Sequence, residues 1–171
     1  KQVLDNRIKL HFIGHLQSNK AKTAVECCDM IETIDRPKIV RALHKHLESE
    51  NRHLQVLVQV NIGEESQKSG GLRQDAESLL TFMQDYPRLR LCGLMTMPPF
   101  TSDPELVRPS FRGLRKIAGR MEAKGLLGKH GKIELSMGMS HDYHVAIEEG
   151  ATLIRIGTAI FGERPPLSKN R

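Results

Sequence analysis

The sequence contains no tryptophan, only 4% aromatic residues and three cysteines among 171 residues. Two cysteines are adjacent, Cys27 and Cys28, and the third is Cys92. Such an odd set gives no disulfide framework and is typical of a reducing compartment, so we expect a cytoplasmic protein. No Cys/His ligand spacing occurs, which argues against structural zinc. Because aromatic rings are few, stacking platforms for single-stranded nucleic acid are also scarce.

Long hydrophobic runs are missing as well. None approaches the roughly 18 to 20 residues that a membrane helix needs, and the first residues lack the apolar stretch of a secretory signal. The net charge is +6, but charges of both signs are mixed along the chain. Such a surface suits an anionic small ligand, and we expect neither a membrane nor a nucleic acid as partner. Residues 1–171 are expected to form one domain and a monomer.

Short apolar runs alternate with longer amphipathic stretches. Strands are predicted at 9–14, 30–34, 54–61, 89–97, 132–137 and 152–157. Helices are predicted at 36–51, 73–85, 107–121, 142–149 and 158–162. Asp35 is the expected N-cap of the first of these helices, Pro109 starts or kinks the third, and Gly150 closes the fourth.

Strands that alternate with helices predict an α/β fold with a parallel sheet. Two architectures fit: a doubly wound open sheet and a (β/α)8 barrel. A barrel requires eight strands, so in a barrel two βα units, on the order of 60 residues, would be absent from this sequence. In both architectures ligands bind at the carboxyl ends of the strands.

The end of the last predicted strand carries the most informative residues. Arg155 alternates with Ile154 and Ile156, so we expect it to point inward while the isoleucines face a helix layer. Gly157 allows close backbone approach, and amides at the start of the helix from Thr158 suit a phosphate. No acidic neighbour of Arg155 is evident in the sequence. These residues alone leave two interpretations open: a phosphate site, or a salt bridge beside a turn glycine.

Several motifs occur in a fixed order along the chain. They are His11-Phe12-Ile13-Gly14-His15-Leu16-Gln17-Ser18-Asn19-Lys20, Val58-Gln59-Val60-Asn61, Gln67-Lys68-Ser69-Gly70, Gly93-Leu94-Met95-Thr96-Met97, Leu135-Ser136-Met137-Gly138-Met139-Ser140 and Arg155-Ile156-Gly157-Thr158-Ala159-Ile160-Phe161-Gly162. From about His11 to Glu163 the chain resembles the pyridoxal phosphate homeostasis protein family, which is similar to the barrel domain of alanine racemase.

The resemblance implies a barrel of the fold type III class that binds pyridoxal 5′-phosphate (PLP). It implies that Ser136 or Ser140, with Gly157 and Thr158, holds the cofactor phosphate, and that Arg155 lies beside the pyridine nitrogen. A guanidinium there keeps its proton, so the ring nitrogen stays unprotonated and the ring is a weaker electron sink. His11 and Asn61 are further candidates because both are expected to point inward.

The family's Schiff-base lysine lies on a strand upstream of the His-Phe-Ile-Gly motif, and neither Lys1 nor Lys9 stands in that strand's motif. We therefore expect the sequence to be N-terminally incomplete and to lack the covalent anchor.

The implied function is vitamin B6 homeostasis: the protein holds PLP, or delivers it to client enzymes, without catalysis. One alternative is an amino-acid racemase, which needs an acid/base group on each face of the substrate α-carbon. The only tyrosines are Tyr86 and Tyr143, and neither is expected at a strand end. The other alternative is a barrel for a different phosphate ligand or for RNA.

Overall fold

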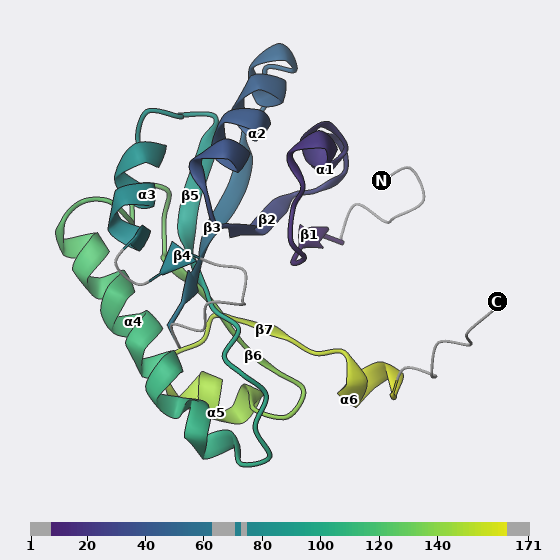
Figure 1. Cartoon of the computed structure of the whole chain (residues 1–171), viewed down its shortest axis with the longest axis vertical. Coiled ribbons are helices and arrows are strands. Elements are labelled where there is room, and N and C mark those ends of the chain that lie inside the picture. Colours follow the sequence, from purple (N-terminus) through teal and green to yellow (C-terminus); the bar gives the residue numbers. More distant parts are fainter. Residues whose placement is uncertain (1–7, 63–70, 73–74, 164–171) are drawn as a thin grey trace.

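The computed structural model describes residues 8–62, 71–72 and 75–163, and strands alternate with helices along this part of the chain (Figure 1). The strands are β1 (His11–Phe12), β2 (Met30–Ile34), β3 (Leu54–Asn61), β4 (Gly71–Leu72), β5 (Leu89–Met95), β6 (Glu134–Met139) and β7 (Leu153–Arg155). The helices are η1 (Ser18–Lys20), α1 (Ala21–Cys27), α2 (Pro37–Ser49), α3 (Asp75–Met83), η2 (Pro104–Val107), α4 (Arg108–Ala123), α5 (Tyr143–Glu148) and α6 (Thr158–Phe161). The predicted α/β class is confirmed.

All strand pairs are parallel, and the sheet has the order β1-β2-β3-β5-β6-β7 with β4 attached to β3. This order follows the chain without reversal, as in a (β/α) barrel, whereas a doubly wound sheet reverses at a switch point. Within the described residues β1 and β7 each pair with one neighbour. The sheet is therefore an open half-barrel, and closure by eight strands stays a prediction.

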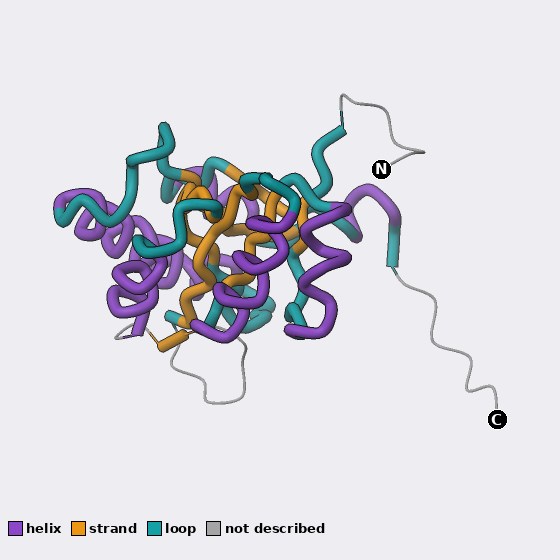
Figure 2. Tube along the Cα trace, turned by 90° about the horizontal axis from the view of Figure 1, so that it is seen from above, coloured by secondary structure: helices purple, strands orange, loops and turns teal. Residues whose placement is uncertain are grey.

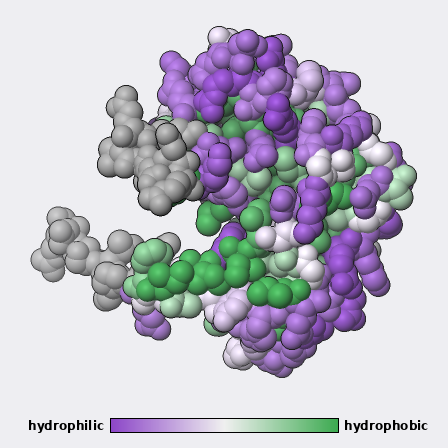
Figure 3. All heavy atoms as spheres, turned by 180° about the vertical axis from the view of Figure 1, so that it is seen from behind, coloured by the Kyte–Doolittle hydropathy of each residue, from purple (hydrophilic) through white to green (hydrophobic). Residues whose placement is uncertain are grey.

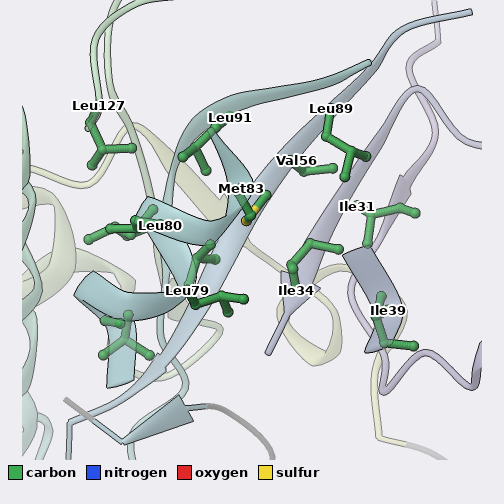
Figure 4. Packing of buried hydrophobic residues seen from close by; sticks show 14 of the residues in the cluster. Ile31, Ile34, Ile39, Val56, Leu79, Leu80, Met83, Leu89, Leu91 and Leu127 are labelled. Atoms are coloured by element: carbon green, nitrogen blue, oxygen red, sulfur yellow. The ribbon is translucent and has the colours of Figure 1, made fainter. Parts of the chain in front are cut away.

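One large hydrophobic core joins helices α1 to α5 to the outer face of the sheet. Figure 2 shows the strands at the centre with helices flanking them. In Figure 4, Met83 of α3 lies near Val56 of β3, and Ile31 of β2 lies near Ile39 of α2; these side chains are at most 3% exposed. Burial of side chains of this size stabilises the fold by about 1.5 to 3 kcal/mol each. A smaller cluster, Met30, Leu57, Cys92 and Met95, fills the inner face.

Helix α2 shows where sequence patterns held and where they failed. Its predicted stripe of Ile39, Val40, Leu43 and Leu47 is fully buried, as periodicity required. The prediction of Asp35 as N-cap is wrong, because the cap is Arg36 and no side chain caps the helix. Proline at position 37 suits the first helical turn and sets the start there. The Asp35 carboxylate instead accepts a 2.6 Å hydrogen bond from Arg36.

Within the described residues, the last strand is less covered by helices than we expected. Ile154 is 40% exposed, and α6 extends away from the body of the protein (Figure 1). Ile160 and Phe161 are 68% and 84% exposed, and Figure 3 shows hydrophobic side chains gathered along this arm. The prediction that Ile154 and Ile156 face a helix layer is therefore wrong, because both line a cavity instead.

A buried carboxylate ties α5 to α4. The Glu149 side chain is 5% exposed and accepts hydrogen bonds from Arg112 (2.8 Å) and Arg108 (3.3 Å). The hydrogen bond from Arg112 outweighs burial and lowers the pKa of Glu149. Since the folded pKa lies below the unfolded one, this carboxylate stabilises the fold above the unfolded pKa, and the stabilisation is lost as pH falls toward the folded value.

We expect Glu149→Gln to flatten the acid limb of the stability profile. Below the unfolded pKa of about 4.3 the free energy of unfolding of the wild-type protein should fall as Glu149 takes up a proton. The glutamine of the variant does not titrate, so the variant should not show this fall. Urea denaturation at pH values from 7 down to about 3 measures this difference. The exposed Glu122, replaced by glutamine, is the control and should keep the wild-type slope. Parallel profiles for wild type and Glu149→Gln would contradict the assignment.

Candidate functional site

A cavity of about 700 Å³ lies beside the carboxyl ends of β1, β6 and β7. Its polar lining residues are His11, Glu32, Ser140, His141, Arg155 and Thr158. Apolar side chains, including those of Ile13, Met97 and Phe100, complete the wall. This volume is in the range of small-molecule sites, and the position at the strand ends is where barrels bind their ligands. The cavity is therefore the candidate functional site.

Arg155 of β7 reaches into the barrel interior, and its guanidinium is fixed at both terminal nitrogens. Nη1 donates a 2.7 Å hydrogen bond to Oγ of Ser136, and Nη2 donates a 2.9 Å hydrogen bond to the backbone oxygen of Thr96. The Thr96 hydroxyl in turn donates to the backbone oxygen of Val60 (2.8 Å). Burial lowers the pKa of Arg155, but a guanidinium in a protein stays charged. The site thus presents a fixed cation.

Glu32, in the middle of β2, is the acidic partner that the sequence did not reveal. Its side chain is 3% exposed, and Oε2 accepts a 2.5 Å hydrogen bond from Ser136 while Oε1 lies 2.8 Å from Nδ1 of His11. Burial would raise the pKa of Glu32, but the hydrogen bonds from His11 and Ser136 outweigh it and lower the pKa. No acidic neighbour of Arg155 was evident in the sequence, and the structure supplies one in Glu32, which is linked to Arg155 through Ser136.

His11 of β1 takes part in the same network from the opposite end of the sheet. The hydrogen bond with Glu32 is the main reason that the pKa of His11 is raised above its usual value of 6.5. The His11 side chain is 28% exposed and lines the cavity. A second cationic side chain can therefore face a bound ligand near neutral pH.

Ser140 follows β6 and lies against the chain that leaves β7. Its Oγ accepts hydrogen bonds from the backbone amides of Gly157 (3.1 Å) and Ala159 (3.3 Å). The turn that brings Ser140 there depends on Gly138, whose φ of +92° is rarely adopted by other residues. A Cβ at Gly138 would also lie 2.6 Å from that of Ala146. Two amides that converge on one oxygen are suited to an anionic oxygen.

The structure brings five of the seven predicted site residues around the cavity: His11, Ser140, Arg155, Gly157 and Thr158. Ser136 lies behind Arg155, is 0% exposed and already bonds Glu32 and Arg155, so of the two serines only Ser140 lines the cavity. Asn61 ends β3, where it pairs with Leu72 of β4, and it does not line the cavity.

The missed residues are Glu32 and Thr96. A charged residue inside an otherwise uncharged, buried strand was the available signal for Glu32. Thr96 acts through its backbone oxygen, for which side-chain identity gives no signal.

None of the described residues that line the cavity is a lysine. Lys9 is exposed, and Lys1 and Lys68 lie outside the described residues. Across 8–62, 71–72 and 75–163 no group of three His, Cys, Asp or Glu residues is placed to hold a metal ion. In the same part of the chain no helix combines the length and the apolar character needed to cross a bilayer.

Comparisons with known proteins show which family the chain resembles. Residues 3–165 match the family model for the alanine racemase N-terminal domain. The chain is 40% identical over 160 residues to a pyridoxal phosphate homeostasis protein of Aquifex aeolicus (94% of this chain, 69% of the relative). It is 44% identical over 161 residues to one of Vibrio alginolyticus (94% and 67%). The chain thus spans about two thirds of the length of these relatives.

Solved structures show the same relationship. PipY of Synechococcus elongatus PCC7942, solved with PLP bound, superposes with a TM-score of 0.81 at 31% identity over 91% of this chain and 71% of PipY. Alanine racemase of Clostridium difficile 630 superposes with a TM-score of 0.70 at 12% identity over 92% of this chain and 40% of the enzyme, which shows a shared fold only. The chain belongs to the alanine racemase N-terminal domain family and, within it, to the pyridoxal phosphate homeostasis proteins.

Proposed function

We propose that this protein binds PLP in the cavity between β1, β6 and β7 and serves vitamin B6 homeostasis by holding the cofactor or delivering it to client enzymes. The observation that carries the proposal is the pairing of Arg155 with the Ser140–Gly157 corner on one cavity wall. Arg155 offers a fixed donor to the pyridine nitrogen. Ser140, Gly157 and Thr158 offer hydroxyl and amide groups to the phosphate. The PLP-bound relative PipY supports the same ligand.

The described residues also favour a role without catalysis. PLP supplies an electron sink to the enzymes that use it, and its strength depends on protonation of the ring nitrogen. Arg155 cannot give up its proton, and its guanidinium is oriented by Ser136 and Thr96. A donor held in this way keeps the ring nitrogen unprotonated, so binding is retained while the electron sink is weakened. The fold type III assignment, the cytoplasmic location and the monomeric state are part of the same proposal.

One observation favours a second candidate, a racemase-like enzyme. His11 is oriented by the Glu32 carboxylate and lines the cavity, an arrangement that general bases use. Racemization needs a second acid/base group on the other face of the substrate. Neither tyrosine is placed to supply this group. Tyr86 packs on Phe82 and His44, and Tyr143 of α5 does not line the cavity. Interconversion of L- and D-alanine by the PLP-loaded protein would establish this alternative.

The proposal predicts saturable binding of one PLP per chain. We expect titration followed by absorbance and fluorescence to reach 1:1 stoichiometry, with inorganic phosphate competing weakly. Borohydride makes a Schiff base between PLP and a lysine permanent. If no described lysine anchors PLP, the cofactor should therefore still be removed by dialysis after borohydride treatment. Loss of exchange would place a lysine at the site. No binding, or equal binding of any phosphate compound, would contradict PLP as the ligand.

Thr158→Ala tests the phosphate end of the site. Loss of one neutral hydrogen bond costs about 0.5 to 1.5 kcal/mol, so PLP binding should weaken roughly 2- to 10-fold. Thr23 is exposed on α1 outside the cavity, and Thr23→Ala is the matched control with wild-type affinity. Equal affinity of both variants would move the phosphate away from Thr158.

A further inference from the structure

Glu32 is the only acidic residue among the described residues that line the cavity. An anion-binding cavity gains nothing from a carboxylate directly, because like charges repel. The side chain is nevertheless buried in the cavity wall, at 3% exposure, with both oxygens engaged. Any effect of Glu32 on ligand binding must therefore act through the side chains to which it is hydrogen-bonded.

The contacts of Glu32 cross the interior of the half-barrel. β2, which carries Glu32, and β6, which carries Ser136, are not neighbours in the sheet. The 2.5 Å hydrogen bond between these side chains joins residues 104 positions apart. On one side, Ser136 accepts a hydrogen bond from Arg155 of β7 (2.7 Å). On the other side, Glu32 is hydrogen-bonded to Nδ1 of His11 of β1 (2.8 Å). One carboxylate thus links the two outermost strands of the described sheet path.

Both ends of this network are side chains that line the cavity and can carry positive charge. Without the carboxylate, the Ser136 hydroxyl would lose its acceptor and His11 would lose the partner of Nδ1. Arg155 would keep its hydrogen bond to Thr96, but the Ser136 oxygen that accepts its second hydrogen bond would no longer be held in place. The guanidinium of Arg155 could then rotate. Leaving the buried Ser136 hydroxyl without an acceptor is unfavourable, so the arrangement of both side chains depends on the carboxylate.

We propose that Glu32 is a positioning residue of the cavity: one carboxylate oxygen holds Arg155 through Ser136, and the other holds His11, so that both cations keep the arrangement that receives the ligand. This inference rests on the proposed function for the nature of the ligand. It assigns to Glu32 no contact with the ligand itself.

Two substitutions separate the charge of Glu32 from its hydrogen bonds. In Glu32→Gln the amide can still accept from Ser136 and donate to a neutral His11, so the network survives without the charge. In Glu32→Ala both links are lost. Asp35→Asn is the matched control. Asp35 is a partly buried carboxylate just beyond the same strand, bonds Arg36 and does not line this cavity.

The first measurement uses the ligand-free protein and NMR. We expect the guanidinium protons of Arg155 to exchange with solvent roughly 10-fold faster in Glu32→Ala, as loss of one charge-assisted hydrogen bond implies, but close to the wild-type rate in Glu32→Gln and Asp35→Asn. The His11 titration should shift to lower pH in both Glu32 variants, with Asp29 and Glu134 as the remaining acids that raise its pKa. A loosened fold would not separate the two variants in this way.

The second measurement is PLP affinity. Glu32→Ala should bind PLP roughly 10-fold more weakly, whereas Glu32→Gln should stay within about threefold of wild type. Unchanged Arg155 exchange in Glu32→Ala would overturn the inference, and so would unchanged affinity in a wild-type protein that binds PLP. If the wild-type protein binds no PLP, the proposed function fails, and the exchange rates alone decide whether Glu32 positions Arg155.

Discussion

Replacing Arg155 with glutamine is expected to weaken PLP binding roughly 10- to 100-fold, the largest loss of affinity that we predict for a single substitution at this site. Glutamine keeps a donor and much of the side-chain length but loses the charge and the planar fork that bonds Ser136 and Thr96. A hydrogen bond to a charged group contributes about 1.5 to 3 kcal/mol, which gives this range. Equilibrium titration of PLP against the purified variant measures the loss.

Two further variants make the result specific. Arg155→Lys keeps the charge without the fork and should fall between wild type and Arg155→Gln, because a lysine cannot hold both acceptors in one plane. Arg90 is exposed at the amino end of β5, away from the cavity, so Arg90→Gln controls for loss of net charge. Arg155→Gln also removes one of the two positive charges near Glu32, so thermal unfolding is measured beside affinity. A folded Arg155→Gln with wild-type affinity would show that the ligand does not meet Arg155.

Part of this site follows from the sequence because parallel strands end at one edge of a sheet. Arg155, Gly157 and Thr158 follow the last strand, Ser140 follows the strand before it, and all four line one cavity. The residues alone left two interpretations open, a phosphate site or a salt bridge. The family resemblance added the chemical identity of the ligand.

The Glu32 network could not be derived in the same way. The contact between Glu32 and Ser136 depends on the curvature that brings β2 and β6 together across the interior, and alternation along a strand does not specify curvature. Asn61 differs from the other candidates in its position. It satisfies the inward pattern, but it ends β3, whereas the cavity gathers at β1, β6 and β7.

Buried strands were predicted more accurately than edge strands. β2 and β3 have the predicted bounds because apolar residues fill most positions of these largely buried strands. β1 and β7 pair with one neighbour each and are shorter than predicted, since fewer hydrogen bonds define their ends. Helix α1 was missed because its buried residues, Ala21, Ala24 and Val25, are small and span only two turns. β6 is shifted by two residues from the predicted bounds, and α3 ends two residues before the predicted end, a usual scatter at element ends.

Gly93→Ala should produce the largest loss of stability. Gly93 of β5 pairs in register with Glu134 of β6, and a Cβ at this position would lie 1.9 Å from the backbone oxygen of Glu134 and 2.7 Å from its carbonyl carbon. These atoms belong to a neighbouring strand and cannot turn aside as a side chain can. The two strands would have to separate, with loss of ladder hydrogen bonds beside Ser136.

We expect the free energy of unfolding to fall by about 3 kcal/mol, measured by urea denaturation. Overpacking typically costs about 1 to 3 kcal/mol, and a backbone oxygen that cannot move aside places this position at the upper end. Gly119 provides a control of opposite sign. It lies on the exposed face of α4 with open space where a Cβ would be, so Gly119→Ala should raise stability by roughly 0.5 to 1 kcal/mol. If Gly93→Ala unfolds at the wild-type urea concentration while Gly119→Ala shifts as expected, the β5–β6 pairing described for Gly93 is incorrect.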